Sequence, residues 1–126
     1  MKINLTLLFL LSFVIAGAQT KSPEGDKYFL QGSQLIFTED KGEATALFTK
    51  AFAEYQKVTD HRKMNECIIA LATIHFLNGN YTAALTKFEE AKEKHQVHFA
   101  DDEDGILIIN DSIELCKKEI KALNQQ

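Results

Sequence analysis

The sequence is poor in residues that interrupt helices, since its 126 residues include one proline and six glycines. The proline, Pro23, is followed by Glu24, a pair that suits the first turn of a helix, and no later segment contains a proline. No segment alternates between apolar and polar residues with the period of a strand. We therefore expect an all-α fold.

Long apolar runs are also scarce. The stretch 5–15 is too short to span a bilayer, which needs ~20 residues. It follows Lys2 and precedes Ala16-Gly17-Ala18, the order of charged start, apolar core and small-residue cleavage site found in secretory signal peptides. We expect residues 1–18 to be a signal peptide cleaved near Ala18/Gln19, with 19–24 a short polar leader. The product would be periplasmic or secreted, and a permanent anchor is the alternative.

The sequence has no concentration of positive charge. Its net charge is −4 and its lysines are scattered, which excludes the basic stripe of a nucleic-acid or anionic-lipid binder. It also lacks a nucleophile elbow, a glycine-rich phosphate loop and paired carboxylates on one buried face. We expect neither an enzyme nor a cofactor.

A metal site is weighed around His95 and His98, which precede the acidic run 101–104. No cysteine lies nearby, and Ala100 stands where a calcium loop would have its first carboxylate. We expect a solvated loop and no metal.

Five helices are expected from apolar residues at spacings of three and four. The third is apolar on nearly every side, so it should be sandwiched between neighbours. The expected ranges are 24–38, 43–59, 61–77, 81–96 and 106–123.

A repeat of forty residues relates two of these helices. Ala44-x3-Phe48-x2-Ala51 recurs as Ala84-x3-Phe88-x2-Ala91. A fixed period of this size is typical of stacked helical hairpins, which usually bind other proteins.

The two hairpins resemble tetratricopeptide repeats of the longer, 40-residue-period variety. The resemblance implies antiparallel helical hairpins stacked as a short solenoid, and an unrelated helical bundle is the alternative. It divides a domain over 25–126 into a repeat at 25–58, a repeat at 65–98 and a capping helix at 106–123. In the second hairpin the positions that match the repeat pattern are Ile68, Leu71-Ala72, His75, Ala84, Phe88 and Ala91. In the first hairpin they are Tyr28, Gln31-Gly32, Leu35, Ala44, Phe48 and Ala51.

The resemblance also implies a binding groove, because the first helix of each repeat lines the inner surface. Three uses of this apolar surface stay open: binding a partner segment, self-association, and burial under the chain's own last helix. We expect an exported, non-catalytic module that binds a protein or peptide, with a self-assembling homo-oligomer or a small metal-binding protein as alternatives. The groove positions are Phe29, Ser33, Ile36, Phe37, Ile69, Thr73, Phe76 and Leu77.

The two cysteines are expected to be buried free thiols. The period maps Cys116 onto Phe76, which lies ~13 Å along a helix from Cys67, whereas a disulfide needs Cα atoms within ~7 Å. An antiparallel last helix would favour a disulfide instead.

Overall fold

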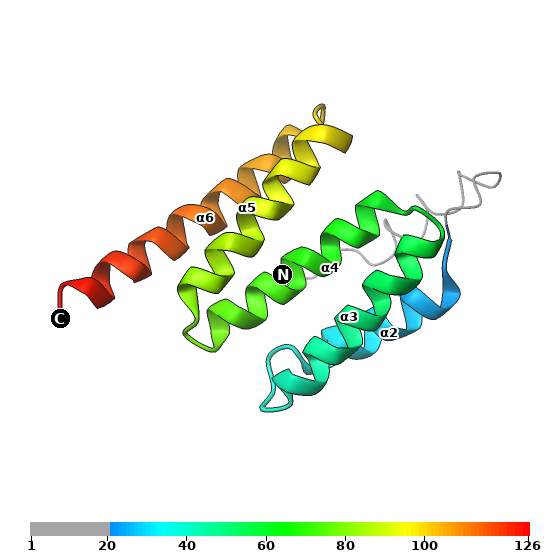
Figure 1. The fold of residues 1–126 in the computed structure, drawn as a ribbon, viewed down its shortest axis with the longest axis horizontal. Helices are drawn as coiled ribbons and strands as arrows, with labels where there is room; N and C mark the ends of the chain where they lie inside the picture. Colours follow the sequence, from blue (N-terminus) through cyan, green and yellow to red (C-terminus); the bar gives the residue numbers. More distant parts are fainter. Residues whose placement is uncertain (1–20) are drawn as a thin grey trace.

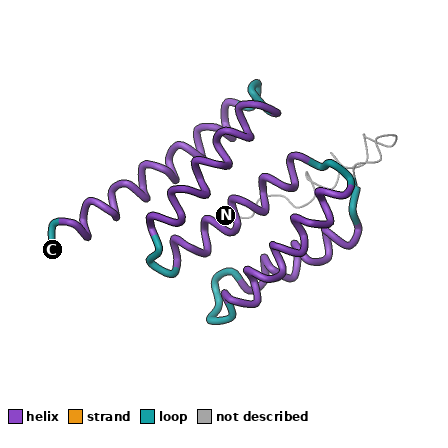
Figure 2. Tube along the Cα trace, in the orientation of Figure 1, coloured by secondary structure: helices purple, strands orange, loops and turns teal. Residues whose placement is uncertain are grey.

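The computed structural model describes residues 21–126, and the expected signal peptide at 1–18 lies outside them. Within this range the chain is helical and has no strand, which confirms the all-α prediction (Figure 2). No helix in the described range is long and apolar enough to span a bilayer. The elements are α2 (Pro23–Leu35), α3 (Lys41–Lys57), α4 (His61–Leu77), α5 (Tyr81–His98) and α6 (Glu103–Asn124).

Each helix packs against the one that follows it in the chain. Figure 1 shows α6, α5, α4 and α3 in a row, with α2 beside α3 at one end. The chain therefore forms two antiparallel hairpins, α2–α3 and α4–α5, extended by α6, an arrangement consistent with a repeat-like solenoid.

Side-chain caps begin three of the helices. The side chains of Ser22, Asp60 and Asp102 each accept a hydrogen bond from the backbone N–H three residues later, which satisfies a free donor of the first turn. Asp102 starts α6 at Glu103, three residues before the expected start at Ile106.

Other helix ends also differ from the prediction, and α3 lies two residues earlier at both ends, at 41–57 instead of 43–59. The first helix ends at Leu35 instead of Thr38, because the Thr38 backbone N–H and hydroxyl both donate to the Leu35 carbonyl and close a turn there. The fourth continues to His98, two residues beyond the expected end at Gln96.

Helix α4 is buried on two sides, as its apolar sequence predicts. Ala70 and Ile74 join a cluster with Phe48 of α3, whereas Ile68 and Ala72 join a cluster formed with α5 and α6. This helix therefore links the two halves of the core.

The forty-residue repeat marks equivalent buried positions. Ala44 and Ala84 are both 0% exposed, Phe48 is 1% and Phe88 is 5% exposed, and Ala51 and Ala91 are again both 0%. Gly32 permits the close approach of α2 to α3, since a Cβ atom there would lie 3.1 Å from the Phe48 ring. The predicted spacing therefore corresponds to a real repetition of helix contacts.

Cys67 and Cys116 are free and buried, which confirms the prediction. They belong to different core clusters. Burial raises the pKa of the Cys67 thiol to about 12, so the thiol stays protonated and unreactive at neutral pH.

Candidate binding groove and its polar end

The predicted groove residues of α2 occupy two kinds of position. Ile36 is buried with Phe48 and Ile74, and Phe29 is half-buried with its ring edge-on to the Phe48 ring at 5.3 Å. Ser33 is exposed and donates its hydroxyl hydrogen to the Phe29 carbonyl. Phe37, just beyond the helix, is 78% exposed.

The predicted residues of α4 are more accessible. Ile69 and Phe76 are half-buried against the α4–α5–α6 core, and the Phe76 ring packs edge-on to Tyr81. Thr73 donates its hydroxyl hydrogen to the Ile69 carbonyl, and Leu77 is 41% exposed. Together with the α2 residues they form what we call the groove face.

Side chains from the α2 segment and from α4 approach each other at two points of this face. The Lys63 ammonium of α4 lies 4.9 Å from the centroid of the Phe29 ring of α2, and at the far end Ile36 packs in the same cluster as Ile74. The groove face therefore runs the length of α4, from Lys63 to Leu77.

Helix α6 does not extend the groove face. Its buried residues, Ile109, Ile113 and Cys116, stand forty residues after the groove positions Ile69, Thr73 and Phe76. These α6 side chains are buried in the core cluster with α5, so the last helix hides the face that α4 leaves accessible. It leaves Leu107, Ile108 and Leu115 exposed.

A pocket of about 290 Å³ opens between the starts of α4 and α6, at the end of the groove face that contains Ile69. We call it the polar-end pocket. Its polar walls are Arg62, Asn65, Glu66, His95 and Asp102, and its apolar walls include Ile69, Phe99, Ile108 and Ile109. A larger hollow of about 600 Å³ between the start of α5 and the end of α6 has no charged side chain in its walls.

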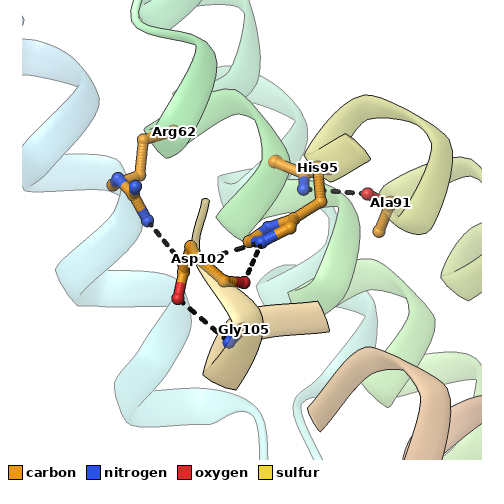
Figure 3. Close-up of polar contacts among 6 residues, drawn as sticks. Arg62, Ala91, His95, Asp102 and Gly105 are labelled. Atoms are coloured by element: carbon orange, nitrogen blue, oxygen red, sulfur yellow. Dashed lines mark hydrogen bonds and ion pairs between the residues drawn. The ribbon is translucent and has the colours of Figure 1, made fainter. Parts of the chain in front are cut away.

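Asp102 organises the polar end. Figure 3 shows its side chain between Arg62 and His95, with the backbone of Gly105 below. One carboxylate oxygen accepts from the Gly105 N–H at 3.1 Å, and the other lies 3.4 Å from the Arg62 guanidinium. His95, which is buried, directs Nε2 at the Asp102 carbonyl oxygen at 2.9 Å, so Nε2 carries the hydrogen.

Two aromatic contacts fix the surrounding side chains. The Arg62 guanidinium lies 4.2 Å from the centroid of the Phe99 ring, and the His61 and His98 rings stack at 3.8 Å. Desolvation, His61 and Lys94 together lower the pKa of His98. The histidines weighed as metal ligands thus have separate partners, and the described residues contain no group of three or more donors arranged to hold a metal.

Asp102 is expected to make α6 sensitive to acid. The Gly105 N–H, followed by Arg62 and His95, holds the pKa of the Asp102 carboxyl below its usual value, against a smaller opposing effect of desolvation. A lowered carboxyl pKa contributes stability above the unfolded pKa of about 3.9, and this contribution is lost as the pH falls through the folded pKa.

Asp102→Ala should therefore lower the free energy of unfolding by about 1 kcal/mol at pH 7, the usual effect of removing a helix cap. The difference in free energy of unfolding between this variant and wild type should become smaller below pH 4, where the wild-type carboxyl becomes protonated. Urea unfolding at pH 7 and at pH 3 measures it, and Asp102→Asn, which keeps a capping oxygen, is the control. A difference that stays constant with pH would contradict this role.

Most of the polar end was not predicted from the sequence. The acidic run 101–104 is typical of a solvated loop, and no motif marks Arg62, Asn65 or Phe99 as a site residue. A signal was present: Arg62 and Asp102 stand forty residues apart, as do Asn65 and Gly105. The period predicts that such residues occupy corresponding positions, but not that they face one pocket.

Comparison with known proteins supplies no assignment, since no family model, curated protein or solved structure matches the chain.

Proposed function

We propose that this chain is an exported, non-catalytic helical-repeat module of the tetratricopeptide kind, which holds a segment of another polypeptide on its groove face. Export rests on the signal-peptide pattern in residues 1–18. The binding role rests on the apolar side chains that stay accessible along α4 after the core has formed.

The distribution of exposed apolar residues carries this proposal. Phe37 and Leu77 are 78% and 41% exposed at one end of the groove face, and Ile69 and Ile108 line a pocket at the other. Accessible apolar surface gathered along a groove is characteristic of association sites, and grooves between helices accept amphipathic or extended segments.

The state of the two thiols in residues 21–126 favours binding over thiol-based catalysis. Both thiols are fully buried, and burial raises the pKa of each. The carboxylates that line the polar-end pocket, Glu66 and Asp102, already pair with Lys63 and Arg62. These pairings favour a structural role for the charged groups in the pocket.

Peptide selection tests the proposal. Twelve-residue peptides displayed on phage and selected on the 126-residue chain should include binders whose Kd, measured by fluorescence anisotropy, rises at least about tenfold with the double change Phe37→Asp and Leu77→Asp. The reason is that a carboxylate on the groove face forfeits the burial of apolar partner atoms.

Leu30→Asp is the matched control, because Leu30 is 57% exposed on α2 and lies outside the predicted groove. It should leave the Kd unchanged, and thermal melts should show all variants folded. Equal loss of binding in both variants, or a library that yields no binder, would refute the proposal.

Self-assembly is the second candidate, favoured by the exposed Leu107, Ile108 and Leu115 of α6. Light scattering separates the two functions. A mass that stays monomeric over a wide concentration range removes the assembler, whereas a tight dimer that Phe37→Asp and Leu77→Asp dissociate removes the adaptor.

A further inference from the structure

The side-chain carbonyl of Asn65 is a buried hydrogen-bond acceptor without a partner. Asn65 is 4% exposed, and its Nδ2 donates to the Ala91 carbonyl of α5 at 3.0 Å. Because that carbonyl can only accept, the bond fixes the amide orientation and leaves Oδ1 on the other side. Oδ1 has no hydrogen-bond partner among the described residues. Buried polar atoms are almost always paired, so this oxygen is suited to an external donor.

Asn65 is part of the wall of the polar-end pocket, whose charges are already balanced. Arg62 pairs with Asp102 at 3.4 Å, and Lys63 pairs with Glu66 at 3.0 Å. A buried cation would need a further negative charge, and burying an unpaired charge costs far more than burying a neutral group that forms a hydrogen bond. The pocket therefore favours a neutral N–H donor over an ammonium group.

The size and the walls of the pocket further limit the kind of ligand that fits. A volume of about 290 Å³ lies at the lower limit of the range of about 300–1,000 Å³ that holds whole small molecules. Ile69 and Ile108 provide apolar wall in the pocket that Asn65 also lines. Such a site suits one apolar side chain together with the amide next to it, a combination that any extended polypeptide supplies.

We propose that the polar-end pocket is a subsite for polypeptide main chain. A backbone N–H of the bound segment donates to Asn65 Oδ1, and the neighbouring apolar side chain packs on Ile69 and Ile108. This inference rests on the proposed function, since Ile69 belongs to the groove face, and it makes the polar end the point that positions the bound segment along α4.

Two small probes test the subsite on the whole chain. N-acetyl-leucine N′-methylamide carries one apolar side chain between two amide N–H groups. Its fully N-methylated analogue has the same side chain, more apolar surface and no N–H. The proposal expects saturable NMR shifts of the Asn65 side-chain amide with the first probe, and about three- to tenfold weaker binding of the second, the loss expected for one hydrogen bond.

Ile108→Asp provides a variant that does not disturb the Asn65–Ala91 bond, since Ile108 is 66% exposed. It should abolish the shifts, whereas Leu115→Asp, at 44% exposure on the same helix and outside the pocket, should preserve them. Equal or tighter binding of the methylated probe, shifts at the hollow beside Tyr81 and Ile120, or no shifts at all would overturn the subsite.

The two proposals can fail separately. If the phage-selected peptides bind the groove face and the Asn65 amide signals do not move, the subsite is wrong and the proposed function stands. If no peptide binds anywhere on the chain, the proposed function fails as well.

Discussion

Phe48→Ala should lower the free energy of unfolding by about 3–5 kcal/mol, the usual cost of truncating a buried phenylalanine. Phe48 is 1% exposed, packs against Gly32 of α2 and shares a cluster with Ala70 and Ile74 of α4. Its removal would leave a cavity where three helices meet. Because domains of this size have a total stability of about 5–15 kcal/mol, chemical denaturation should detect the change easily.

Phe88→Ala should lower the free energy of unfolding by a similar amount, because Phe88 is the equivalent of Phe48 one repeat later. Phe88 is 5% exposed and is buried in the cluster formed by α4, α5 and α6. Phe37→Ala is the control, since a side chain that is 78% exposed should change stability by less than about 0.5 kcal/mol. A small effect at Phe48 beside a large one at Phe88 would show that the two hairpins are not equivalent in packing.

Gly105→Ala should destabilise the protein by about 1–2 kcal/mol, although alanine is usually the better helix former. A Cβ atom at this position would lie 2.5 Å from both His95 Cε1 and Asp102 Oδ2. His95 is buried, and Asp102 is held by its cap to Gly105 and its pair with Arg62. Neither side chain can move without losing contacts, so overpacking should outweigh the gain in helix propensity.

Gly42→Ala is the matched control. Gly42 lies in the first turn of α3, and a Cβ atom there would meet nothing within 4 Å. This change should stabilise the protein by up to about 1 kcal/mol, because alanine restricts the unfolded chain more than glycine does. Urea unfolding of both variants should give effects of opposite sign, and effects of equal sign would contradict the close packing of α6 on α5.

Much of the fold could be predicted because the signals are local. Asp60 caps α4 as expected, and the residues at Asn78-Gly79-Asn80 form the expected turn, with Gly79 at a positive φ of 79°. The sequence predicts the start of α6 three residues late, because the acidic run that contains Asp102 is typical of a loop. The capping role of that carboxylate depends on its hydrogen bond to Gly105. The acidic run around it is equally typical of a solvated loop.

The sequence by itself determined the five helices of residues 21–126, their order and the forty-residue repetition of their contacts, since apolar spacing and caps act within a few residues of the chain. Only the tertiary structure decided how α6 is rotated about its own axis. Its apolar residues define one face, but not whether that face, at Ile109 and Ile113, lines a groove or packs on α5. That rotation also brings Asp102 and Ile108 beside Asn65 and so creates the polar-end pocket, because contacts between residues forty apart depend on how whole helices pack.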